Sequence, residues 1–173
     1  DGGRNFAVQN GNFTSRYMLS IVRDVERANR FYATSNNTAT GGGFFFVSDD
    51  AGKTWTPSMR NLSVVRTTPF SILQDRKAPE NIYLGTNAGF YRSTDRGKSW
   101  ATIPAPKAAP APKKKPVKGK AAPKAPVVAA VKRVPVLKET IRALHSTNDD
   151  ANGILAATDK GLYRTYNVNA GWE

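Results

Sequence analysis

The chain has 173 residues, 39% of them hydrophobic, and carries 26 basic against 13 acidic side chains, for a net charge of +13. This length accommodates one domain of ordinary size, and no apolar run approaches the roughly 20 residues of a transmembrane helix. The lack of cysteine excludes disulfides, thiolate metal sites and cysteine nucleophiles, and a single histidine, His145, excludes multi-histidine metal sites.

Three units of similar sequence follow one another along the chain. Each has three short apolar or alternating runs, the last leading into an Asp/Gly turn and a tryptophan; the runs lie at 20–24, 31–34 and 45–55, at 71–75, 82–86 and 90–100, and at 141–145, 154–158 and 162–172. Runs of β-branched and aromatic residues bounded by Asn, Gly and Asp predict strands. The tryptophan then begins a fourth strand, at 54–59 and 99–103 in the first two units.

The spacing of the units predicts the fold. Trp55 and Trp100 are 45 residues apart, and four antiparallel strands in about 45 residues is the size of one β-propeller blade. We therefore predict an all-β chain, a β-propeller segment of about three four-stranded antiparallel blades. Three blades are too few to close a ring, so we expect the other blades to come from sequence outside this chain or from another chain.

The composition divides the chain into three regions. Residues 1–103 hold the end of one blade and two further blades, 104–136 form an insertion, and 137–173 form a further blade without its last strand. Both ends fall in the same kind of turn, which predicts a piece of a longer protein. In the alternative, residues 4–14 supply a strand that completes the blade at 137–173.

The insertion holds eight of the eleven prolines, and ten basic residues without an acidic one lie between 104 and 138. Closely spaced prolines oppose helices and sheets, and lysines repel one another, so we predict a flexible Lys/Ala/Pro-rich tether. Its basic cluster is Lys113, Lys114, Lys115, Lys118 and Lys120. Three roles are open for the tether: an inert spacer, a contact for an acidic protein or anionic polymer, or a nucleic-acid contact. Nucleic-acid binding is disfavoured because no aromatic residue, on which a base could stack, lies between 101 and 140.

The first two turns share the pattern Ser-x-Asp-x-Gly-x-Thr/Ser-Trp. The pattern is carried by Ser48, Asp50, Gly52, Thr54 and Trp55, and again by Ser93, Asp95, Gly97, Ser99 and Trp100. The third turn is degenerate and keeps Thr165, Asn167 and Trp172. This pattern resembles the Asp-box, or BNR repeat, of sialidases, xyloglucan-degrading hydrolases, sortilin-type receptors and Ycf48-type photosystem II assembly factors.

The box residues suit structural roles. An Asp carboxylate accepts N–H groups within its own turn, Gly adopts backbone angles that other residues resist, and Trp packs against the sheets. In the family that the pattern resembles, the box lies away from the active site, so the resemblance implies structural roles for Asp50 and Asp95. It also implies a bacterial protein that is extracytoplasmic or secreted.

Outside the boxes, the sequence contains no convergent set of acids, histidine and nucleophile. Asp24 and Asp75 occupy equivalent positions at the ends of first strands, and this repetition favours a structural role. The carboxylates of the turn at Asp149 and Asp150 are candidate calcium ligands. Their spacing fits no full calcium loop, however, and favours a plain hairpin turn. We predict no catalytic residue, no cofactor and no metal.

The longest loop within a unit, 35–43, contains the candidate binding residues Asn36, Asn37 and Thr38. It joins a second strand to a third, and in propellers this connection shares a face with the fourth-to-first connection, where the tether leaves. We predict that this face binds a partner; a tolerated surface insertion is the alternative.

Two functions from different classes follow. The first is a non-catalytic propeller scaffold that binds a protein or polymer partner. The second is a fragment of a sialidase-like or xyloglucanase-like glycoside hydrolase whose catalytic carboxylates lie outside this chain, because a fold does not determine a function. A basic, adhesin-like surface protein with salt-sensitive binding is a third hypothesis.

Overall fold

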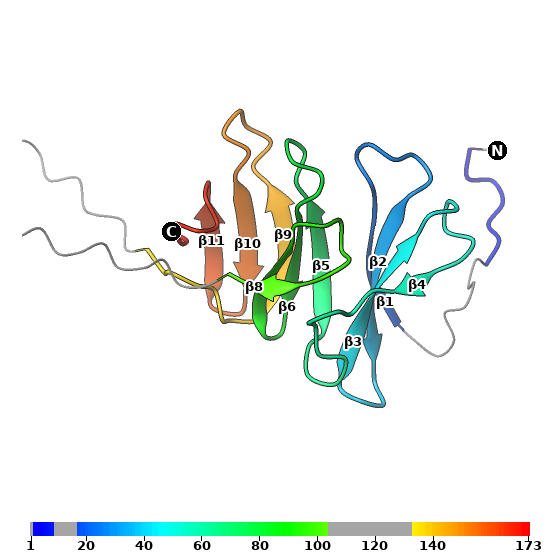
Figure 1. Cartoon of the computed structure of the whole chain (residues 1–173), viewed down its shortest axis with the longest axis horizontal. Coiled ribbons are helices and arrows are strands. Elements are labelled where there is room, and N and C mark those ends of the chain that lie inside the picture. The colour runs from blue at the N-terminus through cyan, green and yellow to red at the C-terminus, as the bar shows by residue number, and fades with distance from the viewer. Residues whose placement is uncertain (1, 9–16, 104–132) are drawn as a thin grey trace, which may run out of the picture.

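The computed structural model describes residues 2–8, 17–103 and 133–173, and all regular secondary structure in these ranges is β (Figure 1). The strands are β1 (Tyr17–Arg23), β2 (Phe31–Asn37), β3 (Gly42–Ser48), β4 (Thr56–Pro57), β5 (Pro69–Gln74), β6 (Ile82–Thr86), β7 (Gly89–Ser93), β8 (Ala101–Thr102), β9 (Ile141–Ser146), β10 (Ile154–Thr158) and β11 (Gly161–Thr165). The described part of the chain has no helix that is long and apolar enough to cross a membrane.

The strands form three antiparallel sheets, with orders β1-β2-β3-β4, β5-β6-β7-β8 and β9-β10-β11, which we call blades 1, 2 and 3. Successive blades stand beside one another, and β1, β5 and β9, the first strand of each blade, are neighbours (Figure 1). This arrangement confirms the prediction of an all-β propeller segment. It also gives the segment two faces: a box face, with the Asp/Gly turns and the connections between first and second strands, and an opposite face, with the second-to-third turns.

The fourth strands are shorter than the runs predicted for them. β4 and β8 each pair through two residues, of which Pro57 has no N–H to donate. The chain stays close to β3 beyond this point, because the Ser58 N–H donates to the Phe45 carbonyl at 2.8 Å. The edge of the sheet is therefore irregular after its first two residues.

The apolar core lies between the blades. One cluster of buried side chains joins blades 1 and 2: Tyr32, Phe45, Leu62, Ile72, Ile82, Leu84 and Trp100. A second cluster joins blades 2 and 3: Tyr83, Phe90, Ile103, Leu137, Ile141, Leu144, Ile154, Ala156 and Trp172. In each joint, an indole meets a phenylalanine of the preceding blade edge to face: Trp100 on Phe45 at 4.7 Å and 73°, and Trp172 on Phe90 at 5.0 Å and 70°.

Residues 133–136, which the composition assigned to the insertion, take part in the joint between blades 2 and 3. Val134 and Trp172 exchange two backbone hydrogen bonds of 2.7 Å, and the Leu137 carbonyl accepts the Phe90 N–H at 3.3 Å. The propeller part therefore includes residues from Arg133 onward. The predicted tether residues 104–132, including the basic cluster at 113–120, lie outside the described residues.

The alternative strand at 4–14 is described only in part. Residues 2–8 form no strand and lie at the opposite end of the row of blades from β11 (Figure 1). The rest of this stretch, within 9–16, lies outside the described residues. The outward sides of blades 1 and 3 keep exposed apolar side chains, with Ile21 at 61% and Leu162 at 68% relative exposure.

Replacing Trp100 tests the joint between blades 1 and 2. Because its indole is 2% exposed and fills the space against Phe45, we expect Trp100→Ala to lower the free energy of unfolding by about 3–5 kcal/mol. Thr56→Ala, at an exposed position of β4, is the control, with an expected change of about 0.5 kcal/mol or less. Urea denaturation followed by fluorescence measures both; equal effects would contradict this account of the joint.

Candidate functional site

The first Asp/Gly turn is held by hydrogen bonds among its own residues. The Ser48 hydroxyl donates to Asp50 Oδ1 at 2.8 Å and accepts the Gly52 N–H at 2.9 Å. The other side of the carboxylate accepts the Thr54 hydroxyl at 2.6 Å, and the Thr54 N–H donates to Oδ1 at 2.8 Å. Hydrogen bonds from Thr54 and Ser48 lower the pKa of Asp50 from 3.8 to about 2.

The second turn repeats this geometry. Ser93 donates to Asp95 at 2.7 Å and accepts the Gly97 N–H at 2.8 Å, while Ser99 donates to Asp95 from its hydroxyl at 2.6 Å and from its N–H at 2.9 Å. Burial acts to raise the pKa of Asp95, and the bonds from Ser99 and Ser93 outweigh it and lower the pKa. Both box carboxylates are thus ionised acceptors inside a turn, with no proton to donate as a general acid.

The degenerate third turn has different bonds. The Thr165 hydroxyl donates to the Gly171 carbonyl at 2.8 Å and accepts the Asn167 N–H at 3.1 Å, and the Asn167 side chain accepts the Asn169 N–H at 3.0 Å. The tryptophan nevertheless stays in place, since Trp172 is 2% exposed. The turn that delivers the indole can therefore change while the indole remains.

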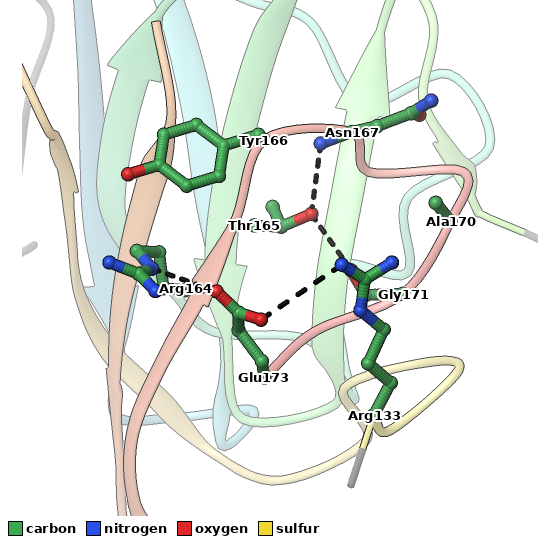
Figure 2. A pocket seen from close by; sticks show the side chains of 8 residues that line it. All are labelled: Arg133, Arg164, Thr165, Tyr166, Asn167, Ala170, Gly171 and Glu173. Atoms are coloured by element: carbon green, nitrogen blue, oxygen red, sulfur yellow. Dashed lines mark hydrogen bonds and ion pairs between the residues drawn. The ribbon is translucent and has the colours of Figure 1, made fainter. Parts of the chain in front are cut away.

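A small cavity of about 90 Å³ lies beside this turn, lined by Arg133, Arg164, Glu173 and residues 165–167, 170 and 171 (Figure 2). Arg164 donates to Glu173 Oε1 at 2.6 and 3.0 Å, and the Arg133 guanidinium lies 4.0 Å from the other carboxylate oxygen. The carboxylate therefore already occupies the space between the two guanidiniums. The cavity is too small for a drug-sized ligand.

The candidate binding residues Asn36, Asn37 and Thr38 do not lie in a long loop. β2 continues to Asn37 and β3 starts at Gly42, so only residues 38–41 form the turn, and the expectation of an extended loop was wrong. The Asn37 side chain accepts the Ala39 N–H at 3.2 Å, which stabilises the turn.

Two glycines explain the longer hairpin. A Cβ on Gly42 would lie 2.1 Å from the Val64 carbonyl oxygen, and one on Gly43 would lie 2.3 Å from the Ser35 carbonyl oxygen. Glycine therefore lets β3 run on against the connection to blade 2. The Thr40 hydroxyl also reaches the Val64 carbonyl, at 3.5 Å, so the second-to-third turn of blade 1 and the fourth-to-first connection lie on one face.

The same face carries a feature that the sequence analysis missed. Each first strand has a register shift near its start, and the shifts leave Leu19, Phe70 and Arg142 outside the regular pairing. Bulges of this kind redirect a side chain and are common near binding sites. Arg142 is exposed, and its guanidinium lies 4.7 Å above the Phe70 ring.

The charged residues beside these bulges are mostly basic. Arg66 lies in the connection between β4 and β5, where its carbonyl accepts a hydrogen bond from the Asn87 side chain. Lys138 precedes β9. Lys160 lies in the tight turn between β10 and β11, next to Asp159. The Phe70–Arg142 pair therefore lies on a face with a local excess of positive charge.

On the box face, Asp24 holds blades 1 and 2 together. This buried carboxylate accepts Tyr32 Oη at 2.5 Å and Gln74 Nε2 of blade 2 at 3.0 Å, and it pairs with Arg96 of blade 2 at 3.1 Å. Burial acts to raise the pKa of Asp24, and the hydrogen bonds from Tyr32, two backbone amides and Gln74 outweigh it and lower the pKa from 3.8 to about 2.

The remaining residues that were singled out from the sequence make contacts within turns and strands. Asp149 accepts the Thr147 hydroxyl at 2.6 Å and Tyr166 Oη at 3.1 Å within its turn. Within residues 2–8, 17–103 and 133–173, no group of three or more acidic or histidine side chains could hold a metal ion. His145 is the next-to-last residue of β9, where it pairs with Leu155, and its side chain is exposed.

Comparisons with known proteins find one short match to a family model and a likeness of fold. A family model described as BNR/Asp-box repeat matches residues 46–57, and no curated protein matches the sequence. Among solved structures, Ycf48 bound to a D1 peptide aligns with 18% identity and a TM-score of 0.56, covering 92% of this chain and 39% of that one. An ancestral GH74 enzyme aligns with 18% identity and a TM-score of 0.58, covering 91% of this chain and 18% of that one.

A GH74 xyloglucanase from Xanthomonas campestris aligns with 17% identity and a TM-score of 0.53, covering 90% of this chain and 23% of that one. The chain thus spans less than half of each of these structures. Residues 46–57 match the BNR/Asp-box repeat and the fold is that of a β-propeller segment, in agreement with the resemblance seen in the sequence. At these identities the likeness concerns the fold alone.

The depressed pKa of Asp24 predicts a loss of stability in acid. Its folded pKa lies below its ordinary value, so the stabilisation is present above about pH 4 and is lost as the pH falls towards 2. We expect Asp24→Asn to be less stable than the wild type at pH 7 and the gap to narrow between pH 4 and 2. Urea titrations at several pH values measure this; a gap that is constant with pH would contradict it.

Proposed function

We propose that this chain is part of a non-catalytic β-propeller binding module for a protein partner, which docks on the face of the second-to-third turns. The observation that carries the proposal is the state of the repeated carboxylates. Asp24, Asp50 and Asp95 each accept three or more hydrogen bonds from neighbouring groups that build the fold. Carboxylates held in this way serve the turns and joints and are not available for acid–base chemistry.

The face with the bulges offers the partner site. It combines the partly buried Phe70 ring, the exposed Arg142 guanidinium above it, and the basic side chains of Arg66, Lys138 and Lys160. A guanidinium that stacks on an aromatic ring keeps its N–H edge free for a carboxylate. We therefore infer an acidic peptide segment as the partner, in keeping with the net charge of +13.

Likeness of fold supports this proposal without deciding it. Ycf48, one of the similar structures, was solved with a D1 peptide bound. The GH74 structures favour the alternative, a glycoside hydrolase fragment whose catalytic carboxylates lie outside this chain. A location outside the cytoplasm is part of the proposal and rests on the resemblance of the boxes to those of secreted and surface proteins.

Selection of peptides from a random displayed library tests the partner class. We expect acidic peptides to be enriched and to bind Arg142→Glu about tenfold more weakly, because the substitution removes a charge-assisted contact and adds repulsion. Lys53→Glu, at an exposed position of the box face, makes the same change in net charge and is the control. Equal weakening by both variants, or hydrolysis of xyloglucan by the chain, would contradict the proposal.

A further inference from the structure

The two joints between blades differ in their polar contacts on the box face. In the joint between blades 1 and 2, Arg96 crosses from the second box to blade 1, where its guanidinium pairs with Asp24 and with Glu26. Arg96 adopts a left-handed φ of 59°, an uncommon conformation for a residue other than glycine. This conformation accompanies a side chain that bridges two blades.

The acceptor half of this bridge is repeated in blade 2. Asp75 lies at the position of Asp24 and, like it, accepts two backbone N–H groups that follow it, from Lys77 at 2.9 Å and Ala78 at 3.1 Å. Tyr83, at the position of Tyr32, also points its hydroxyl at the carboxylate. In Asp75, however, this hydroxyl is 3.3 Å away, compared with 2.5 Å for the Tyr32 hydroxyl and Asp24.

The guanidinium of the donor half is missing. Asp24 receives both Gln74 and Arg96 from the later blade, whereas Asp75 receives one side-chain donor from blade 3, Asn152 Nδ2, at 2.8 Å from Oδ1. Val168 stands at the position of Arg96 in the repeat, and this β-branched residue does not adopt a positive φ. A cavity of about 350 Å³ lies between blades 2 and 3 at this point, with Asp75 and Tyr83 on one wall and Asn152, Asn167 and Val168 on the other. Its volume lies in the range of about 300–1,000 Å³ that is typical of small-ligand sites.

Two cations complete the lining. Lys77 lies at the position of Glu26, and its ammonium donates to the Asp150 carbonyl on the rim. Arg92, which belongs to β7, also lines the cavity. Asp75 Oδ1 already accepts Asn152 and two backbone N–H groups, whereas Oδ2 has the Tyr83 hydroxyl at 3.3 Å. This carboxylate and two cationic groups share one cavity, so a bare cation or a bare anion would meet a group of its own sign.

We propose that this cavity is a binding site for an arginine residue that carries a carboxylate within its own length, such as an arginine at the C-terminal end of a partner chain. The guanidinium takes the place that Arg96 has in the other joint and donates to Asp75 Oδ2. The carboxylate lies towards Lys77 and Arg92, and the Asn167 amide and the Asn152 amide oxygen contact the backbone of the ligand. Such a ligand has no net charge, so the positive chain does not repel it.

This site is on the opposite face from the one proposed for the acidic partner. It rests on the comparison of the two joints, so its test is independent of that function. The ligand that it takes contains a guanidinium, whereas the acidic partner is recognised through carboxylates. A failure of one experiment therefore leaves the other unaffected.

Titration of the whole chain with N-acetylarginine, N-acetylcitrulline and N-acetylarginine methylamide tests the site by NMR. Citrulline has the shape of arginine without its charge, and the methylamide lacks the carboxylate. We expect N-acetylarginine to shift the side-chain amide signals of Asn152 and Asn167 and to leave that of Asn87, on the other face, unchanged. We expect both analogues to bind about tenfold more weakly. Equal binding of arginine and citrulline, or shifts confined to Asn87, would overturn the proposal.

A variant that supplies the missing group gives a second test. Val168 lines the cavity, so Val168→Arg extends a guanidinium into it and we expect N-acetylarginine binding to be lost. We also expect a higher melting temperature than that of Val168→Met, which has a similar length without the charge. In Asp75→Asn the difference between these two variants should disappear, because the acceptor is neutral. Undiminished binding of N-acetylarginine to Val168→Arg would show that the ligand lies elsewhere and overturn the proposal.

Discussion

Each joint between blades depends on an indole that the later blade presses against a phenylalanine of the earlier one. Trp100 meets Phe45 and Trp172 meets Phe90 with nearly the same geometry, although the two turns that deliver them have different hydrogen bonds. A buried aromatic contributes more to stability than any single polar contact of these turns. The role of the box is therefore to position a tryptophan, and the role of its carboxylate is to stabilise the turn through hydrogen bonds.

This division of labour explains what varies between the joints. With the indole in place, the polar groups above it are free to differ: Arg96 closes the first joint on Asp24, while Val168 leaves a cavity in front of Asp75 in the second. The same holds on the opposite face, where equivalent bulges carry Leu19, Phe70 and Arg142. Residues that differ between equivalent positions of the blades are therefore the positions where a binding function can arise without cost to the fold.

The repeat made the frame predictable from sequence, and the limits of that prediction have physical causes. Strands, blade order and boxes follow from a period of 45 residues, because each unit must bury the same side chains against its neighbour. The hairpin at 35–43 was misjudged because its glycines suggested a loop, whereas they permit close packing against the Val64 carbonyl.

The candidate sites lay beyond such reasoning for a different reason. The stacking of Arg142 on Phe70 and the reach of Arg96 to Asp24 connect residues more than 70 positions apart, and neither pair has a local sequence signal. A signal did exist for the cavity, since alignment of the boxes sets Val168 against Arg96 while Asp75 still matches Asp24. Asp75 keeps its position although the guanidinium opposite it has been replaced: Asn152 supplies one neutral donor to Oδ1, and Oδ2 is left with the more distant Tyr83 hydroxyl.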